Sequence, residues 1–191
     1  MERAELEGVL AFLATAERLK DTPRTGHTSQ GRVESTAEHS WRLCLLALVM
    51  GDAMPGVDRD RLIRICLVHD LAEALTGDEP APLKKQGDGK PARERAALRT
   101  IVAPLPPATA ASIVALWEEY EAAATPEARL AKGLDKLETL AQHAQGLNPP
   151  GFNLAYNRQY GRAETDFHPL LAGLRALLDD ATEARLAEMV G

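Results

Sequence analysis

The chain has few aromatic residues (4%), only two cysteines and no excess of positive charge. Cys44 and Cys66 each lie in an apolar stretch, where a free thiol behaves as a small hydrophobic side chain, so we expect no disulfide framework. The net charge of −6 argues against binding to polymeric nucleic acid or to an anionic membrane, because both require clustered positive charge. One small anionic substrate is still compatible, since it needs only a local metal ion and an arginine or two.

Long apolar runs and strand-like alternation are also missing. No apolar span approaches the roughly 20 residues of a transmembrane helix, and the first residues do not resemble a secretion signal, so we expect a cytoplasmic protein. No alternating run rich in β-branched residues is long enough to predict a strand. A chain of 191 residues with 45% hydrophobic composition can bury a sizeable core. We expect residues 1–191 to form one compact all-α domain, a helical bundle of about six or seven helices.

The spacing of apolar residues predicts where these helices lie. The expected segments are 4–20, one beginning at Ser35, one beginning after Asp58 and ending near 76–82, and then 92–102, 108–123, 126–145 and 169–189. Ser35 and Glu38 form the S-x-x-E capping box, in which each side chain accepts a hydrogen bond from the other residue's backbone amide. The polar loop at 24–33 is rich in glycine, hydroxyls and arginine, and long ordered loops are often functional.

The third predicted helix contains an ionisable pair within an apolar segment. Residues 65–75 are apolar nearly all round, as in a helix inside a domain, yet His69 and Asp70 interrupt them. An unpaired carboxylate costs several kcal/mol to bury, so Asp70 should be protonated, paired with a cation or bound to a metal. The adjacent histidine favours the metal.

Four side chains are candidate ligands for one divalent transition metal ion, such as cobalt or manganese. They are His39, His69, Asp70 and Asp135. Adjacent residues on a helix point about 100° apart, so His69 and Asp70 can flank one ion while His39 approaches from the neighbouring helix. Asp135 lies at the border of the apolar stripe of its own helix, so periodicity permits its burial.

These residues, in this order, resemble a known family. Glu34-Ser35-x-x-Glu38-His39, then His69-Asp70, then a distant Asp135 resemble the H…HD…D signature of the HD-domain metal-dependent phosphohydrolases. Three further segments are similar to its 5′-deoxynucleotidase branch, which includes HD domain-containing protein 2; they are Pro23–Gly26, His69–Asp78 and Trp117–Glu121. The resemblance covers the chain from the first helix to about residue 169, with the metal-site core at about 35–145.

The resemblance implies an activity and a set of roles. It implies that the two histidines and two aspartates hold one metal ion, and that the chain is a homodimer that hydrolyses deoxynucleoside 5′-monophosphates to nucleoside and phosphate. Glu73 and Asp78 match family positions that act near the attacking water and the substrate. Physically, Glu73 lies one helical turn beyond His69 and can orient or deprotonate that water. Asp78 could protonate the departing sugar oxygen or position the water, and both roles stay open.

Two arginines are candidates for binding the substrate phosphate, because a guanidinium pairs bidentately with phosphate. Arg24 is the first choice and Arg32 the second; both belong to the loop before the His39 helix. Related proteins tend to carry an aromatic residue after the Arg-Thr-Gly, where this chain has His27. The base and sugar preference is therefore left open.

Other prominent side chains are interpreted as structural. Glu38 belongs to the capping box, and His143 and His168 show no partner pattern, so we interpret them as surface or packing residues. Trp117 and Tyr120 are expected in the core or at a dimer contact rather than under a base.

Two other functions are compatible with the sequence. The same metal site could act on another phosphoester, such as a cyclic nucleotide, a nucleoside triphosphate or an alarmone. Alternatively, the chain could be a catalytically silent helical module that binds a nucleotide or a partner protein. A dinuclear iron oxygenase is disfavoured, since it needs further histidines near the His69-Asp70 pair.

Overall fold

The computed structural model describes residues 1–79 and 89–189, and helices dominate this part of the chain, which confirms the all-α fold class. The longer helices are α1 (Arg3–Ala16), α2 (Thr36–Gly51), α3 (Arg59–Val68), α5 (Lys90–Val102), α6 (Pro107–Ala122), α7 (Pro126–Gln145) and α9 (Pro169–Glu188). The short elements are α4 (Glu73–Thr76), α8 (Arg162–Thr165) and the 3₁₀ turns η1 (Glu17–Asp21) and η3 (Leu154–Arg158). None of the described helices combines the length and apolar character needed to cross a lipid bilayer.

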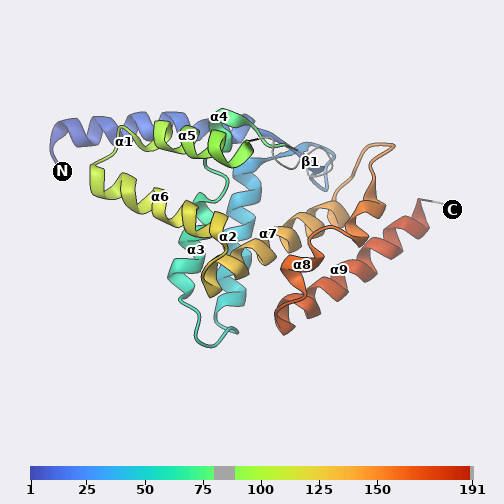
Figure 1. Ribbon diagram of the computed structural model, residues 1–191. Coiled ribbons are helices and arrows are strands. Elements are labelled where there is room, and N and C mark those ends of the chain that lie inside the picture. The colour runs from blue at the N-terminus through green and yellow to red at the C-terminus, as the bar shows by residue number, and fades with distance from the viewer. Residues whose placement is uncertain (80–88, 190–191) are drawn as a thin grey trace.

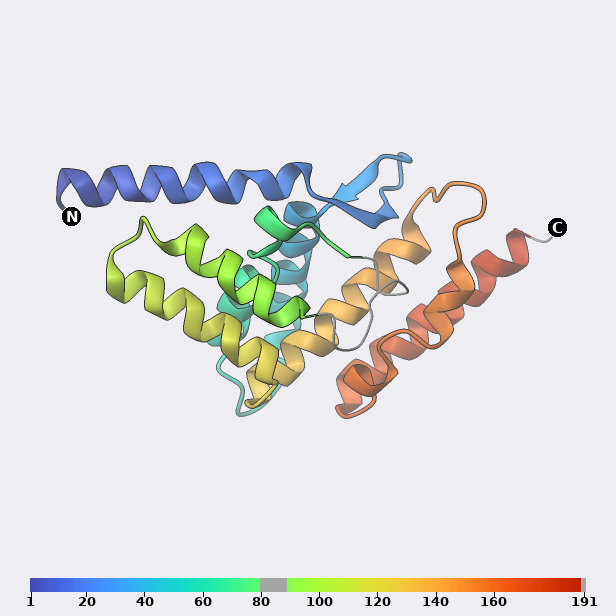
Figure 2. The ribbon, with the colours of Figure 1, turned by 45° about the horizontal axis from the view of Figure 1, so that its top comes forward.

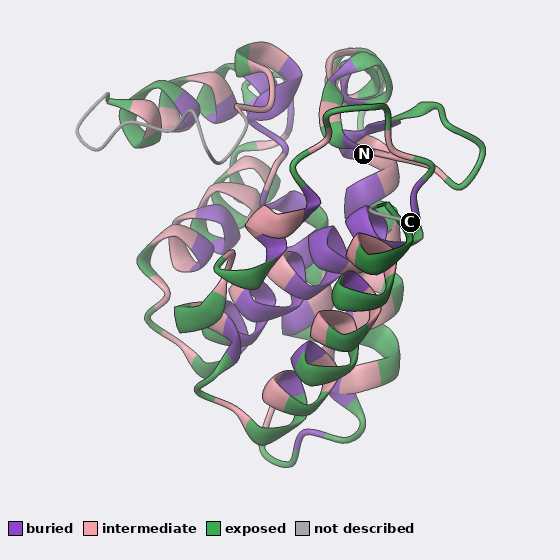
Figure 3. Cartoon of the chain, turned by 90° about the vertical axis from the view of Figure 1, so that its right-hand side faces the viewer, coloured by how far each residue is buried: buried purple, intermediate pink, exposed green. Residues whose placement is uncertain are grey.

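Helices α2, α3 and α7 pack against one another at the centre of the molecule (Figure 1). Helix α6 packs on α3 and α7, α5 packs on α6, and α9 covers another side of α7. The burial pattern in Figure 3 concentrates on these central helices, where Leu43, Leu62 and Leu134 have no exposed surface. The core is mainly aliphatic, as the composition predicts, with Trp117 buried among the leucines and both cysteines free.

Helix α1 forms one edge of the molecule and contributes no buried residue. Its leucines at positions 6, 10 and 13 are each more than half exposed. Figure 2 shows α1 and η1 running along this edge toward the first strand. The first helix packs on the core through the partly buried Val9, Phe12 and Ala16, and η1 continues this contact with the buried Leu19.

A two-stranded antiparallel hairpin precedes α2, where we predicted no strand. Strand β1 (Pro23–His27) pairs with β2 (Val33–Ser35), so the predicted loop at 24–33 is largely a hairpin. The strands are too short and too polar to show the alternation that identifies a strand in a sequence. A tertiary contact supports β1 instead: Gln142 Nε2 on α7 donates to the carbonyl oxygen of His27 at 2.6 Å.

The predicted helix starts are confirmed. The Glu38 amide donates to Ser35 Oγ at 3.3 Å, and the Ser35 amide donates to Glu38 Oε2 at 2.9 Å, so the capping box is complete. Asp58 caps α3 by accepting from the Arg61 amide at 3.0 Å. The cap of α2 places His39 in its first turn, where the side chain is fully buried.

The third predicted helix is interrupted, which corrects the sequence interpretation. Helix α3 ends at Val68 and α4 begins at Glu73, so His69 and Asp70 lie in a turn between them. The Glu73 amide donates to the Asp70 carbonyl at 2.9 Å, a tighter i to i+3 pattern than the α-helix uses. The His69 ring takes the carbonyl oxygen of Cys66 as a partner, and such side-chain bonds compete with helical ones. The expected stop near 76–82 is met by the end of α4, and positions 80–88 lie outside the described residues.

Gly133 allows α7 to approach α8 and α9 closely. A Cβ atom at this position would lie 2.5 Å from the carbonyl oxygen of Glu164 and 2.5 Å from Leu171 Cδ1. These are severe overlaps, and one of them involves backbone that cannot move aside alone. Because Gly133 is two residues before Asp135, this packing also fixes the part of α7 that carries a site residue.

The substitution Gly133→Ala is expected to lower the free energy of unfolding by about 1–3 kcal/mol, because it overpacks the α7–α8 contact. Denaturation in urea measures the change. Gly173→Ala on α9 is the matched control, since no atom lies within 4 Å of its Cβ position. Alanine is the better helix former by about 1 kcal/mol, so the control should be neutral or stabilising. Equal destabilisation by both changes would contradict this account of the packing.

Candidate functional site

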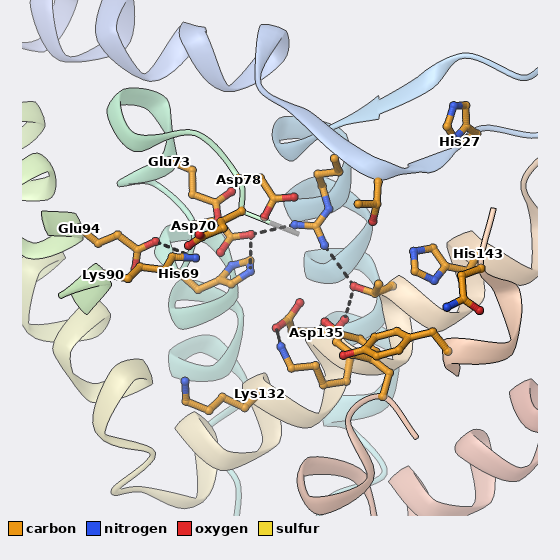
Figure 4. A pocket seen from close by; sticks show the side chains of 18 of the residues that line it. His27, His69, Asp70, Glu73, Asp78, Lys90, Glu94, Lys132, Asp135 and His143 are labelled. Carbon is orange, nitrogen blue, oxygen red and sulfur yellow. Dashed lines mark hydrogen bonds and ion pairs between the residues drawn. The ribbon is translucent and has the colours of Figure 1, made fainter. Parts of the chain in front are cut away.

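A cavity of about 570 Å³ opens beside the central helices. Its walls come from β1, the turn after α3, the helices α4, α5, α6 and α7, and the segment around η3. Most of the side chains predicted to act in catalysis or binding line it; they are Arg24, His69, Asp70, Glu73, Asp78 and Asp135. Figure 4 shows the labelled side chains among them, from His69 to Asp78 and at Asp135, converging from segments that are far apart in the sequence.

The fold brings the four predicted metal ligands together. His39 Nε2 lies 3.2 Å from Asp135 Oδ1 and 3.8 Å from Asp70 Oδ2. His69 Nε2 lies 3.0 Å from the same Asp70 oxygen. One potential ligand atom from each of His39, His69 and Asp70 lies within 4.8 Å of the other two. Asp135 joins this group from α7 through its contact with His39.

Each of the two imidazoles has one nitrogen without a hydrogen-bond partner. Within the described residues, His39 Nε2 and His69 Nε2 are buried, and neither makes a hydrogen bond of acceptable geometry, although carboxylate oxygens are close. Buried polar atoms are normally hydrogen-bonded, so two such atoms in one place need an explanation. A metal ion between the nitrogens and the carboxylates would satisfy both.

The opposite nitrogen of each ring is held by an acceptor. His69 Nδ1 lies 2.8 Å from the carbonyl oxygen of Cys66, which can only accept, so Nδ1 carries the hydrogen. His39 Nδ1 contacts the carboxylate of Glu138, which favours the same assignment. When neutral, the two rings therefore direct their Nε2 lone pairs into the cluster, that of His39 toward Asp70 and Asp135 and that of His69 toward Asp70. This is the tautomer that a metal ligand requires, and such outer hydrogen bonds are usual at metal sites.

Asp135 is also oriented by its neighbours. Its Oδ2 accepts from the Tyr120 hydroxyl at 2.9 Å and from Lys136 Nζ at 2.8 Å, which leaves Oδ1 facing His39. Burial would raise the pKa of Asp135, but Lys136 and the two histidines outweigh it and hold the pKa well below its usual value. Tyr120 is buried, as expected of a core residue, but its direct bond to a site carboxylate was not predicted.

Arg24 enters the cavity from β1 and contacts three elements. Its Nη1 lies 3.3 Å from Asp70 Oδ2, and its Nη2 donates to Thr139 Oγ1 at 3.2 Å. Its Nε lies 3.4 Å from Glu34 Oε2. Burial would raise the pKa of Asp70, but His69, Arg24 and His39 hold it well below its usual value. An anion bound here would meet a guanidinium already oriented by several partners.

Arg32 does not reach the cavity. It is the last residue of the turn between β1 and β2, with 62% of its side chain exposed, and its Nη2 pairs with Glu38 Oε1 at 2.5 Å. This pairing lowers the pKa of Glu38 to about 2. The geometry therefore gives no support to Arg32 as a phosphate ligand. The sequence ranked Arg24 first but kept Arg32 as the second choice, because the hairpin that separates the two side chains was not predicted.

Glu73 and Asp78 lie beside Asp70 on the cavity wall (Figure 4). Glu73 is buried and accepts a hydrogen bond from Thr36 Oγ1 at 3.2 Å. Burial, followed by repulsion from Asp70 and Asp78, raises the pKa of Glu73 to about 10. Without an added cation, this carboxyl therefore holds a proton at neutral pH.

Two buried carboxylates behind His39 were not predicted. Glu138 contacts His39, and its Oε1 lies 2.6 Å from Arg42 Nε in an ion pair. Burial, followed by repulsion from Glu138, raises the pKa of Glu34 to about 7. Ligand atoms of Glu34, His39 and Glu138 also lie within 4.8 Å of one another, so they form a second conceivable cation site. One signal was available in the sequence, since Glu138 lies three residues after Asp135 and hence on the same face of α7.

Two histidines line the cavity away from the carboxylates. His27 and His143 both belong to its wall, and Figure 4 shows them on the side opposite Lys90 and Glu94. His143 is buried rather than at the surface, and its place on the cavity wall was not predicted. His168 lies elsewhere and caps α9 by accepting from the Leu170 amide.

Comparison with known proteins places this geometry in a family. The HD domain matches residues 16–175. A 5′-deoxynucleotidase of Schizosaccharomyces pombe is 36% identical over 148 residues, which cover 74% of this chain and 74% of the relative. A 5′-deoxynucleotidase of Danio rerio is 32% identical over 186 residues, which cover 95% of this chain and 92% of the relative.

A solved structure agrees with these relatives. The crystal structure of a predicted metal-dependent phosphohydrolase from Magnetospirillum magnetotacticum superposes with a TM-score of 0.75 at 31% sequence identity. The match covers 95% of this chain and 97% of the other. The matched segment 16–175 includes every residue of the cluster around His39, His69, Asp70 and Asp135. The chain therefore belongs to the HD-domain family.

Proposed function

We propose that this chain is a metal-dependent 5′-deoxynucleotidase that hydrolyses deoxynucleoside 5′-monophosphates to nucleoside and phosphate. The observation that carries the proposal is the pair of buried, unpartnered Nε2 atoms that face two aspartates at the wall of the cavity. The 5′-deoxynucleotidases that match most of this chain support the choice of substrate. The H…HD…D signature in the sequence, which resembles that of the metal-dependent phosphohydrolases, also supports this function.

In this proposal one divalent transition metal ion, cobalt, manganese or similar, is held by His39, His69, Asp70 and Asp135. The histidines offer Nε2, because their Nδ1 atoms are engaged with Glu138 and with the Cys66 carbonyl. When bound, a divalent ion lowers the pKa of a neighbouring water and of nearby carboxyls and polarises a phosphoryl oxygen.

The remaining roles belong to side chains on the cavity wall. Arg24 binds the phosphate, exchanging its contact with Asp70 for a pair of hydrogen bonds to phosphoryl oxygens. Glu73, as a carboxylate, accepts the proton of the attacking water. Asp78 either protonates the departing 5′ oxygen of the sugar or positions that water. Arg32 is left out of the proposed site, because it pairs with Glu38 outside the cavity.

Purified protein supplied with cobalt or manganese is expected to release inorganic phosphate from deoxynucleoside 5′-monophosphates. Asp70→Ala should abolish this release, whereas Asp52→Ala, an exposed carboxylate on another face, should leave it unchanged. A phosphate assay over ribo- and deoxynucleotides makes the measurement. Pyrophosphate or tripolyphosphate as product would point to a larger phosphoester. Undiminished ligand affinity and biological effect in Asp70→Ala, with no turnover by the wild type, would point to a silent binding module.

Glu138→Gln is expected to weaken metal affinity about 10- to 100-fold, because it removes the charge that holds the Nδ1 hydrogen of His39. Competition with a chelator of known affinity measures the change. Glu183→Gln provides the matched control, since Glu183 is exposed and pairs with Arg158 on another part of the surface. Unchanged metal affinity in Glu138→Gln would show that the hydrogen bond from Glu138 does not hold His39 in the orientation and tautomer that bind the metal.

Glu73→Gln is expected to lower kcat by about 100- to 10,000-fold with little change in KM, because a carboxamide cannot accept the proton of water. Steady-state kinetics on a deoxynucleoside 5′-monophosphate makes the measurement, together with the metal content of the variant. If the variant keeps its metal and retains more than a tenth of the wild-type kcat, Glu73 is not the group that accepts the proton of the attacking water.

The homodimer, the cytoplasmic location and the single domain over 1–191 stay proposals. An exposed apolar stripe on α2 supports the homodimer. Its side chains are each at least 41% exposed; they are Trp41, Leu45, Leu48 and Val49. Apolar side chains at this spacing form a face that a second copy could cover.

A further inference from the structure

Two imidazole nitrogens at the histidine side of the cavity have no hydrogen-bond partner. Within the described residues, His27 Nδ1 and His143 Nε2 are both buried and unpartnered. They come from different elements, β1 and α7, yet both side chains line the same cavity (Figure 4). Neither belongs to the proposed metal cluster or to its outer hydrogen bonds, so the proposed reaction does not yet explain them.

Two successive buried hydrogen bonds determine whether His143 acts as a donor or as an acceptor toward the cavity. Asn157 Nδ2 donates to Thr182 Oγ1 at 3.2 Å, which turns Asn157 Oδ1 toward His143. His143 Nδ1 lies 2.9 Å from that oxygen and donates to it. The neutral ring therefore carries its hydrogen on Nδ1 and presents Nε2 as an acceptor. Burial lowers the pKa of His143, which favours this neutral form.

The surroundings of His143 are suited to a flat, uncharged group. The Phe152 ring meets the imidazole edge to face, with centroids 5.0 Å apart, and Tyr156, one residue before the Asn157 that bonds His143, also lines the cavity. The opposite side of the cavity carries ion pairs, in which Lys90 Nζ lies 3.2 Å from Glu94 and Lys132 Nζ lies 3.7 Å from Glu121. A neutral base placed there would have to displace or desolvate these charges.

Helix α7 sets the distance between the two parts of the site. Asp135, Thr139 and His143 follow one another at four-residue spacing and therefore lie on one face. Asp135 belongs to the metal cluster, Thr139 bonds Arg24, and His143 comes one turn later. The rise from Asp135 to His143 is about 12 Å. An occupant that reaches both must be longer than a phosphate group, as a nucleotide is.

We propose that the wall formed by His27, His143, Phe152 and Tyr156 is the nucleoside subsite, and that His143 Nε2 accepts a hydrogen bond from a donor group of the nucleoside. This inference rests on the proposed nucleotidase function and adds a specificity-determining residue to it. The donor is a hydroxyl of the sugar or an amine of the base, and the shared chemistry is an uncharged N–H or O–H group. A site built to pair with such a group discriminates strongly against an analogue that lacks it.

The first arm of the test uses the wild-type protein and three substrates. These are deoxyadenosine 5′-monophosphate, its 3′-deoxy analogue and its analogue without the 6-amino group. We expect kcat/KM to fall at least tenfold for the analogue that lacks the donor read by His143 and to change less for the other. Equal kcat/KM for all three would overturn the proposal. This arm does not depend on the folding of any variant.

The second arm compares His143→Phe with His168→Phe, the same change at a histidine outside the cavity. His143→Phe should lower kcat/KM for the parent nucleotide about tenfold, mainly through KM, and remove the discrimination seen in the first arm. Inhibition by inorganic phosphate should be unchanged in both variants. Equal losses on all three substrates, or no loss, would overturn the proposal.

A failure of the proposed function is distinguishable from a failure of this subsite. If the wild type turned over no nucleotide, the nucleotidase proposal would fail. Calorimetric Kd values for the same three compounds then test the subsite alone, with the same tenfold difference expected and equal affinities overturning it.

Discussion

The hydrogen bonds on the Nδ1 atoms of His39 and His69 are the constraint on which the site depends. They orient the two imidazoles so that His39 Nε2 faces Asp70 and Asp135 and His69 Nε2 faces Asp70. One acceptor is a side chain from α7 and the other is the backbone of α3, so the packing of α2, α3 and α7 sets the site directly. The close approach at Gly133 and the capping box at Ser35 serve the same end, because each fixes a helix that carries one of these side chains.

Much of the fold and the inner part of the site could be predicted from the sequence. The apolar periodicity locates the long helices, and the S-x-x-E pattern locates the start of α2, because both depend on interactions within one helix. His69 and Asp70 stood out because burying charge in an apolar segment is costly. Asp135 was chosen as the fourth ligand because it lies at the border of an apolar stripe, which permits its burial without requiring it, and the family resemblance then supported the choice.

The features that were not predicted depend on contacts between distant segments. The hairpin of β1 and β2 is short and polar, and a side chain of α7 supports it. The break after Val68 follows local hydrogen bonds that hydropathy does not encode. Tyr120 and His143 contact side chains that their own sequence neighbourhoods do not specify. Glu138 shares a face of α7 with Asp135, but its contact with His39 arises only from the packing of α2 on α7.

Anomalous diffraction at the absorption edge of bound cobalt or manganese would locate the ion and identify its ligands. We expect one peak coordinated by Nε2 of both His39 and His69 and by carboxylate oxygens of Asp70 and Asp135. A peak among Glu34, His39 and Glu138, where a second set of ligand atoms also converges, would contradict this expectation, as would metal-soaked crystals with no ordered ion.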